Sequence, residues 1–306
     1  VHELLVQLTN SVSREWRHRT KLEEKLIRVA RECPDAFAQK YTVENTDPVM
    51  VPATPNYPLY IICSVGCSLG AITAVHEAYP PAIRERNDEM LLPIHKAAAC
   101  SITPDNVIDY LIRRHPASLI HTKGSFARQT TPLHIACANF WPTSMEENGR
   151  KRRSAPSTMT NRILKILKAC PAAALVQENC ETGHSPLARL IDRPSGGEKT
   201  PPELIEAFVN AAPFSLKNTF KPIHIGATHT NPQDYLLSRA GTPERTFRAL
   251  LKGCPNQFNI YPLERLSFEK KLLVVESFVK STFDLEPSYT AKYTLHAVVL
   301  CPMSPT

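Results

Sequence analysis

Glycine is scarce in this chain, with 10 glycines among 306 residues. Loops that cradle phosphates depend on glycine, and the sequence contains no glycine-rich phosphate loop. Gly-x-Ser-x-Gly and His-Glu-x-x-His, which mark two classes of hydrolase, are also missing. These absences argue against a nucleotide-dependent enzyme, and we expect a protein that is not an enzyme and has no cofactor.

Long apolar runs are missing as well. No stretch reaches the roughly 18 continuous apolar residues that a membrane helix needs, and residues 1–5 do not resemble a signal peptide. The chain has no Asn-x-Ser/Thr glycosylation site and an odd number of cysteines, nine. Both features favour the reducing cytosol or nucleus over secretion. The first residue is not Met and residues 294–299 look like the start of another helix, so we expect a piece of a longer chain.

Proline, in contrast, is abundant, with 27 residues. One class of prolines precedes Leu or Ile and opens a short apolar stretch. Proline is favoured at the first position of a helix, where its missing N–H would be unpaired anyway, so this class predicts helix starts. Its members are Pro58, Pro93, Pro132, Pro186 and Pro222, and Pro262 is a weaker example. The first five follow one another at 35, 39, 54 and 36 residues.

A second class of prolines ends apolar helical segments, because proline cannot continue the hydrogen-bond ladder. Around each of them, the positions eight before, five before and three after are apolar. The prolines are Pro34, Pro80, Pro116, Pro171, Pro213 and Pro255. The two alternating classes predict a repeating unit of helix, turn, helix and stop, followed by an extended loop. The fold class that we expect is an all-α helix-pair solenoid, in which each unit packs only on its neighbours.

The segment 131–137, Thr-Pro-Leu-His-Ile-Ala-Cys, resembles the Thr-Pro-Leu-His-x-Ala signature of the ankyrin repeat. Residues 92–98 and 221–227 are near variants. The proline ending replaces the usual Gly-Ala of that family, as in the divergent ankyrin repeats of diatoms. The resemblance implies that Thr131 and His134 hydrogen-bond to fix a turn. Leu92 and Lys221 lack the hydroxyl for this bond, and the histidines are interpreted as turn residues rather than catalytic ones.

The pattern predicts one ankyrin-like array over residues 1–306. We expect residues 1–57 to hold an N-terminal cap and a partial first repeat, and 58–259 to hold five full repeats with an insertion loop near 140–160. Residues 260–306 are expected to be degenerate or truncated repeats. Cysteines recur at equivalent positions, for example Cys33 and Cys170 before the stop proline. They are therefore expected to be small buried hydrophobes. The pair Cys63 and Cys67 has no second pair to complete a zinc site, so we expect no metal.

The expected insertion loop near 140–160 contains the densest cluster of basic residues in the sequence. The net charge is +7, and four of the basic residues form one run, Arg150, Lys151, Arg152 and Arg153. The run is interpreted as a solvated loop, with a nuclear-import signal or a contact to an acidic partner as alternatives. Ser154 follows the run and is a candidate phosphorylation site, where a phosphate would place negative charge beside four cations.

The resemblance implies a protein-interaction scaffold that binds a protein partner, of unknown identity, on its concave face and loop tips. The candidate contacts are Arg84, Arg86, Lys123, Phe126, Arg128, Gln177 and Glu178. Phe126 is the preferred anchor, because aromatic residues and Arg are enriched in binding hot spots. Two other readings stay open: a regulatory array of a larger enzyme or channel, and binding of nucleic acid or an acidic partner through 150–153. With that run set aside the charge balance is modest, so nucleic acid is not the expected partner, and neither is a membrane.

Overall fold

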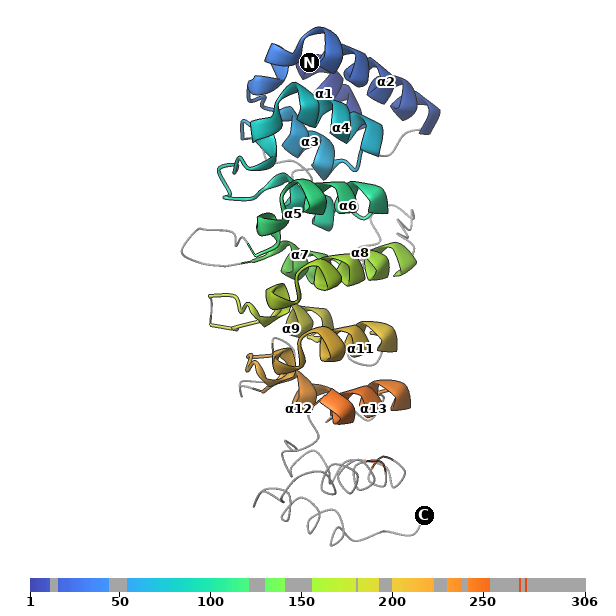
Figure 1. Ribbon diagram of the computed structural model, residues 1–306, viewed down its shortest axis with the longest axis vertical. Helices are drawn as coiled ribbons and strands as arrows, with labels where there is room; N and C mark the ends of the chain where they lie inside the picture. Colours follow the sequence, from blue (N-terminus) through green and yellow to red (C-terminus); the bar gives the residue numbers. More distant parts are fainter. Residues whose placement is uncertain are drawn as a thin grey trace, which may run out of the picture. The chain divides into compact units, whose positions relative to one another are not determined.

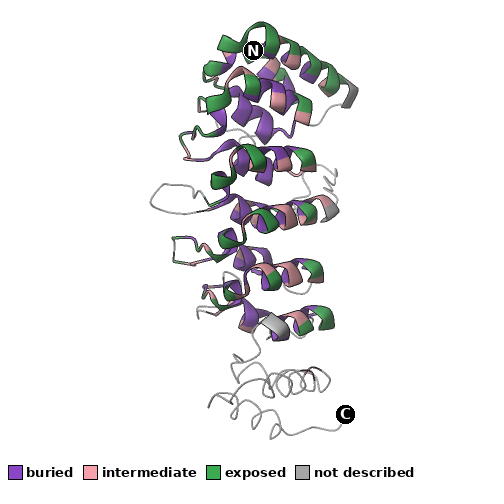
Figure 2. Cartoon of the chain, in the orientation of Figure 1, coloured by how far each residue is buried: buried purple, intermediate pink, exposed green. Residues whose placement is uncertain are grey.

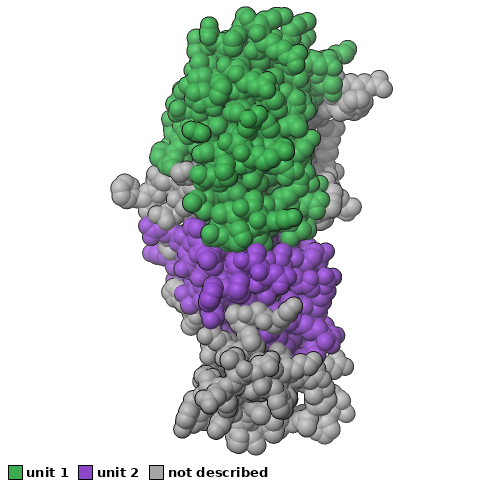
Figure 3. Space-filling view, in the orientation of Figure 1, with its two compact units in different colours: residues 1–173 green, residues 174–306 purple. Residues whose placement is uncertain are grey.

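The computed structural model describes residues 1–11, 16–43, 54–120, 130–140, 156–179, 181–192, 200–222, 230–237, 242–253, 270 and 273. Within these residues the chain forms twelve α-helices and five short 3-10 helices, and no extended strand (Figure 1). The contacts divide the chain into two compact units, residues 1–173 and 174–306 (Figure 3). The predicted all-α class is confirmed.

Unit 1 contains four helix pairs. The first helices of the pairs are α1 (His2–Asn10), α3 (Pro58–Ser64), α5 (Pro93–Ala99) and α7 (Pro132–Ala138). The second helices are α2 (Trp16–Glu32), α4 (Leu69–Ala78), α6 (Asp105–Arg114) and α8 (Pro156–Ala169). First helices contact first helices of the next pair, and second helices contact second helices. Unit 1 is therefore a two-layered stack of helix pairs, as a solenoid requires.

Unit 2 contains two helix pairs in its described residues: α9 (Pro186–Ile191) with α11 (Pro202–Ala211), and α12 (Pro232–Leu237) with α13 (Glu244–Gly253). Here too α9 contacts α12 and α11 contacts α13. The five pairs from α3 to α13 lie within residues 58–253, and the division of 58–259 into five full repeats stays a prediction. Predictions for residues 260–306 lie outside the described residues, apart from 270 and 273.

The starting prolines act as expected. Pro58, Pro93, Pro132 and Pro186 each occupy the first turn of a helix. The fifth start was predicted wrongly, because α12 begins at Pro232 rather than at Pro222. Asn231 precedes that proline, and its Oδ1 accepts a hydrogen bond of 2.8 Å from the N–H of Asp234. An Asn side chain capping the first turn is a strong helix start, and Lys221 offers no such cap.

The stopping prolines do more than end a helix. Pro34, Pro80, Pro116, Pro171 and Pro213 each begin a 3-10 helix, where we expected an extended loop. These helices are η1 (Pro34–Ala38), η2 (Pro80–Ile83), η3 (Pro116–Leu119), η4 (Pro171–Leu175) and η5 (Pro213–Lys217). Proline forces the preceding residue out of the α region, as at His115 with φ −145° and ψ 71°. The chain then turns and continues as a tighter helix.

The three apolar columns face the core as predicted, except that Val29 is only half-buried and Phe258 lies outside the described residues. The residue eight before the stop proline is fully buried: Leu26, Ile72, Ile108, Ile163, Ile205 and Phe247 are 0% exposed. Figure 2 colours the buried parts of the helices purple. The third residue after the proline, such as Phe37 or Leu216, is buried too. Each buried Leu or Ile contributes about 1.5–3 kcal/mol.

In the part of the chain that the structure describes, the segments that follow η1, η2, η4 and η5 each close at their base by backbone hydrogen bonds in a constant register. The residue seven after the stop proline pairs with the residue two before the start proline. Tyr41 pairs with Asn56 through two backbone hydrogen bonds of 2.8 and 3.0 Å, and Phe220 pairs with Thr230 through bonds of 2.7 and 2.9 Å. The backbone N–H groups of Asn87 and Glu178 donate at the same position to Leu91 and His184, respectively. We call these four segments the repeat hairpins 41–56, 87–91, 178–184 and 220–230.

Candidate functional site

The side chains at the hairpin bases fix the hairpins to the first helix of a pair. Asn87 is the clearest case. Its Oδ1 accepts hydrogen bonds from the N–H groups of Glu89 (3.1 Å) and Leu91 (2.8 Å), and its Nδ2 donates to the Tyr60 hydroxyl at 2.8 Å. Burial raises the pKa of Tyr60, so this phenol stays neutral at physiological pH. One buried amide therefore closes the turn and ties it to α3.

Arg84 and Arg86 lie just before this hairpin. Arg84 follows η2, and its N–H donates to the Pro81 carbonyl at 2.9 Å, while its side chain is exposed. Arg86 is half-buried and lines a pocket beside Asn87. Arg84 is accordingly available to a partner, and its role in binding remains a prediction.

Gln177 and Glu178 occupy the base of hairpin 178–184. The exposed Gln177 donates through Nε2 to the carbonyls of Gly183 (3.1 Å) and Thr219 (2.8 Å). Glu178 is only 4% exposed, and both its oxygens accept from Arg189 of α9. We had expected Glu178 at an accessible tip, but its carboxylate faces inward and attaches the hairpin to the helix. A bidentate Arg–carboxylate pair is well suited to that positioning role.

The other predicted partner contacts, Lys123, Phe126 and Arg128, lie outside the described residues. So do the basic run Arg150, Lys151, Arg152 and Arg153 and the candidate phosphorylation site Ser154. Their roles stay predictions.

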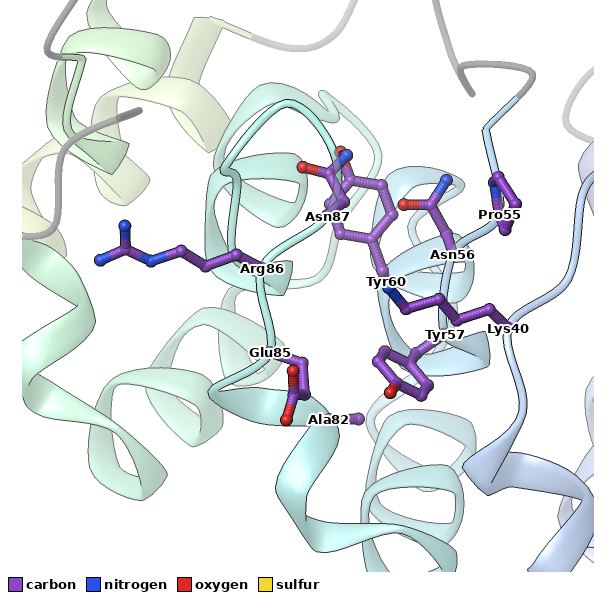
Figure 4. A pocket seen from close by; sticks show the side chains of 9 residues that line it. All are labelled: Lys40, Pro55, Asn56, Tyr57, Tyr60, Ala82, Glu85, Arg86 and Asn87. Carbon is purple, nitrogen blue, oxygen red and sulfur yellow. The ribbon is translucent and has the colours of Figure 1, made fainter. Parts of the chain in front are cut away.

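A small pocket opens between hairpins 41–56 and 87–91 of unit 1 (Figure 4). Its cavity volume is ≈ 10 Å³, about the space of one water molecule. Its lining residues are Lys40, Pro55, Asn56, Tyr57, Tyr60, Ala82, Glu85, Arg86 and Asn87.

Aromatic rings and cations alternate around the pocket. The Lys40 ammonium lies 5.3 Å from the centroid of the Tyr57 ring, and that ring lies 5.3 Å from the ring of Tyr79. The Lys96 ammonium lies 5.7 Å from the ring of Tyr60. Cations over ring faces are attracted by the ring quadrupole, so the rings and ammonium groups hold one another in place. Tyrosine at such a surface offers rigid contact area with little loss of side-chain entropy.

The histidine turns behave as the resemblance implies. Thr131 Oγ1 lies 2.8 Å from His134 Nδ1, and the Thr131 N–H donates to the same nitrogen at 3.2 Å. His95 makes the second of these bonds, because the N–H of Leu92 donates to its Nδ1 at 3.2 Å. In this turn the backbone N–H of Leu92 alone supplies the hydrogen bond to the histidine, without the hydroxyl that Thr131 adds. Both histidines are buried and serve the turn.

Two arginines that the sequence did not reveal, the buried Arg162 and the half-buried Arg19, hold the turns within the helix pairs of unit 1. Arg162 of α8 is 0% exposed and donates to the carbonyls of Ala98 (3.2 Å), Cys100 (2.7 Å) and Thr103 (2.8 Å). Arg19 of α2 donates to the Val65 carbonyl at the end of α3. A cation at a helix C-terminus satisfies unpaired carbonyls and the helix dipole. These arginines stabilise the scaffold and offer no binding site.

Glu23 complements Arg19 at the next helix start. Its Oε2 accepts from the N–H of Ser68, the N-cap of α4, at 3.0 Å, and its Oε1 accepts from Arg19 at 3.2 Å. A carboxylate at a helix N-terminus is stabilising for the same electrostatic reason. The pair clamps both ends of the turn 65–68.

Four of the described thiols, Cys63, Cys67, Cys100 and Cys137, are buried as expected, but the expectation is wrong for Cys33, which is exposed, and for Cys170, which is half-buried, because both stand at the end of a second helix where the chain leaves the core. Burial, together with the neighbouring Cys67 and Cys100, raises the pKa of Cys63, and burial raises the pKa of Cys67 to about 12. Thiols of such high pKa are poor nucleophiles. No group of three His, Cys, Asp or Glu side chains in the described part of the chain is arranged to hold a metal ion. Nor does any described helix have the length and apolar character needed to cross a bilayer.

Comparison with known proteins adds no relative. No family model matches the chain, and no curated protein matches it either.

Proposed function

We propose that the chain is a divergent ankyrin-like array in the cytosol or nucleus, without enzymatic activity, whose hairpins bind a protein partner. The observation that carries the proposal is the constant hairpin base beside a variable tip. Three residues separate Asn87 from Leu91, whereas fourteen separate Tyr41 from Asn56. Loops on a rigid scaffold can vary without cost to the core, and binding residues concentrate on such loops.

The turn chemistry supports the family assignment within this proposal. The Thr131–His134 hydrogen bonds and the proline at the first position of α7 are what the ankyrin signature uses to start its first helix. Within each of the two units, first helices contact first helices and second helices contact second helices. Hairpins that follow the second helix and precede the next first helix then project from the side of the first helices.

Site-specific photo-crosslinking tests the surface. A photoreactive amino acid replaces Arg84, next to hairpin 87–91, and in a second variant Arg113, an exposed residue of α6. Both substitutions remove one exposed arginine from unit 1, so they match in charge. Crosslinks to a discrete protein from position 84 and none from position 113 would support binding at the hairpins. Equal crosslinking at the two positions, or crosslinking from 113 alone, would contradict it.

A further inference from the structure

We propose that Tyr57 and Tyr79 form an oxidative modification site, at which a one-electron oxidant such as a haem peroxidase intermediate joins the two rings as dityrosine. The inference goes beyond partner binding and concerns a crosslink within unit 1. Tyr57 precedes Pro58, which starts α3, and Tyr79 follows α4 and precedes Pro80. The crosslink would therefore join the beginning and the end of one helix pair.

The rings of Tyr57 and Tyr79 are already in contact. Their centroids lie 5.3 Å apart and their planes are inclined by 35°, within the roughly 4.5–7 Å range of aromatic pairs. The largest cause that raises the pKa of Tyr79 is a hydrogen bond with the Tyr57 side chain, so the rings meet at their hydroxyl ends. The ring carbons next to each hydroxyl, which are the positions where phenoxyl radicals couple, are therefore neighbours.

The backbone holds both tyrosines in place. Proline disfavours the α region for the residue before it, and Tyr57 has φ −65° and ψ 147°, while Tyr79 has φ −143° and ψ 83°. The Tyr79 N–H donates to the Val75 carbonyl at 3.2 Å, and the Tyr57 carbonyl accepts from the N–H of Tyr60 at 3.0 Å. Groups held together in this way react as in a unimolecular step, with a high effective concentration.

Both rings are half-buried, so each presents an edge to an oxidant in solution. The Lys40 ammonium lies 5.3 Å from the centroid of the Tyr57 ring. A cation over a ring is attracted by its electrons, and it disfavours the loss of an electron from that ring. We therefore expect oxidation to begin at Tyr79 and the radical to couple with Tyr57 after a second oxidation.

The other described tyrosines lack one of these conditions. Three are buried: Tyr60, Tyr110 and Tyr235. Tyr41 is half-buried, but its ring stacks on His2, with centroids 6.1 Å apart, and its hydroxyl donates to the Ala36 carbonyl at 2.7 Å. Tyr41 is consequently a matched control for the pair.

The reaction balances with two equivalents of the oxidant. Each phenol gives one electron to the oxidant and its hydroxyl proton to water, which leaves one phenoxyl radical on each ring. The two unpaired electrons form a C–C bond between the two carbons that flank the hydroxyls. The hydrogen on each of these carbons then moves to the oxygen of the same ring through solvent, and both rings become aromatic again. The product has lost two protons and two electrons.

Photo-oxidation of the whole chain tests the proposal. A ruthenium tris-bipyridyl complex with persulfate supplies the one-electron oxidant, and free tyrosine in a parallel sample confirms that the mixture couples phenols. We expect a monomeric product in which the peptides of Tyr57 and Tyr79 are joined with the loss of two hydrogen atoms. Its fractional yield should stay constant when the protein is diluted about tenfold, because the step is intramolecular. Absence of this peptide pair while free tyrosine couples, or coupling only between molecules, overturns the proposal.

Three variants locate the crosslink. Tyr57→Phe and Tyr79→Phe should each lose it, whereas Tyr41→Phe should keep it. Each variant removes one hydroxyl from a half-buried ring, so thermal melts should show all three folded. A monomeric crosslink at Tyr57 that survives in Tyr79→Phe would mean that another ring is its partner, and the assignment would be wrong.

Hydrogen exchange reports what the crosslink does to the fold. A crosslink restricts the unfolded chain, as a disulfide does, and this one spans α3 and α4. Exchange in these two helices should become slower in the crosslinked protein, while exchange in α6 should change less. Unchanged exchange in α3 and α4 would contradict the expected closure of the pair.

Discussion

Met90 and Gly183 occupy the same position in their repeats, three residues before the start proline, and both have positive φ, 60° and 57°. They close hairpins 87–91 and 178–184, whose tight turns require the left-handed conformation at this point. Glycine adopts it freely, whereas methionine is strained there by about 1–2 kcal/mol. The two shorter hairpins therefore impose a backbone requirement that one of them meets with a residue other than glycine, whereas hairpin 41–56 has Pro55 at the same position and no positive φ there.

Replacing Met90 with glycine should relieve this strain. We expect Met90→Gly to be more stable than Met90→Ala by about 1 kcal/mol, because both remove the same side chain and only one remains strained. Gly183→Ala should lose a similar amount. Urea denaturation measures all three, and a Met90→Ala variant as stable as Met90→Gly would show that the turn does not demand the left-handed conformation.

Arg162 should be essential to the turn between α5 and α6. Arg162→Leu removes the donor from the carbonyls of Ala98 and Thr103, and it leaves the Cys100 carbonyl with only the N–H of Thr103, 3.1 Å away. Each buried unpaired group costs about 1–3 kcal/mol, of which relief of the buried charge returns a part. We expect a net loss of about 1–3 kcal/mol by denaturation, with faster hydrogen exchange at the end of α5. Arg162→Lys should not restore stability, since a lysine cannot fork to three carbonyls. A leucine variant more stable than wild type would contradict this.

His76 should make stability depend on pH. Its Nδ1 lies 2.7 Å from the Tyr110 hydroxyl, and burial, with Arg114, lowers its pKa below 6.5. Between the pKa values of His76 in the folded and unfolded states, the unfolded chain therefore binds a proton that the folded chain does not bind. The contribution of the neutral His76 ring to the free energy of unfolding is fully present above pH 6.5. It is lost as the pH falls through the pKa of His76 in the folded protein.

The comparison of wild type with His76→Phe measures this contribution. The difference in unfolding free energy between them should change below pH 6.5 and stay constant between pH 7 and 8. A difference that is flat across both windows would exclude the titration of His76 as its cause.

The thiols should divide by accessibility. Cys33 is exposed, while Cys63, Cys67 and Cys137 are buried, and burial raises the pKa of each of these three thiols. Native protein treated with a maleimide at pH 7 should label Cys33 within minutes and the other three only after denaturant is added. Peptide mass spectrometry reads the sites. Rapid native labelling of Cys67 would mean that the turn 65–68 opens in the folded state.

The sequence determined the repeating unit. Proline has no N–H and a fixed φ, so its effect on a helix is local, and Pro93 and Pro116 start and stop helices wherever they stand. The apolar columns, such as Ile108 and Ile163, follow helical periodicity and were predicted for the same reason. The Thr131–His134 bond spans three residues, so the resemblance placed it correctly.

Only the tertiary structure decided how the units are closed. Pro222 and Pro232 are two alternative starting points for α12. The pairing of Phe220 with Thr230 and the cap that Asn231 provides favour Pro232. Arg162 reads as an ordinary surface cation of an amphipathic helix. It is buried because carbonyls some sixty residues earlier in the chain lack donors. Such pairings depend on which backbone carbonyls and N–H groups lack hydrogen-bond partners once the repeats have stacked. The local sequence does not indicate which groups these are.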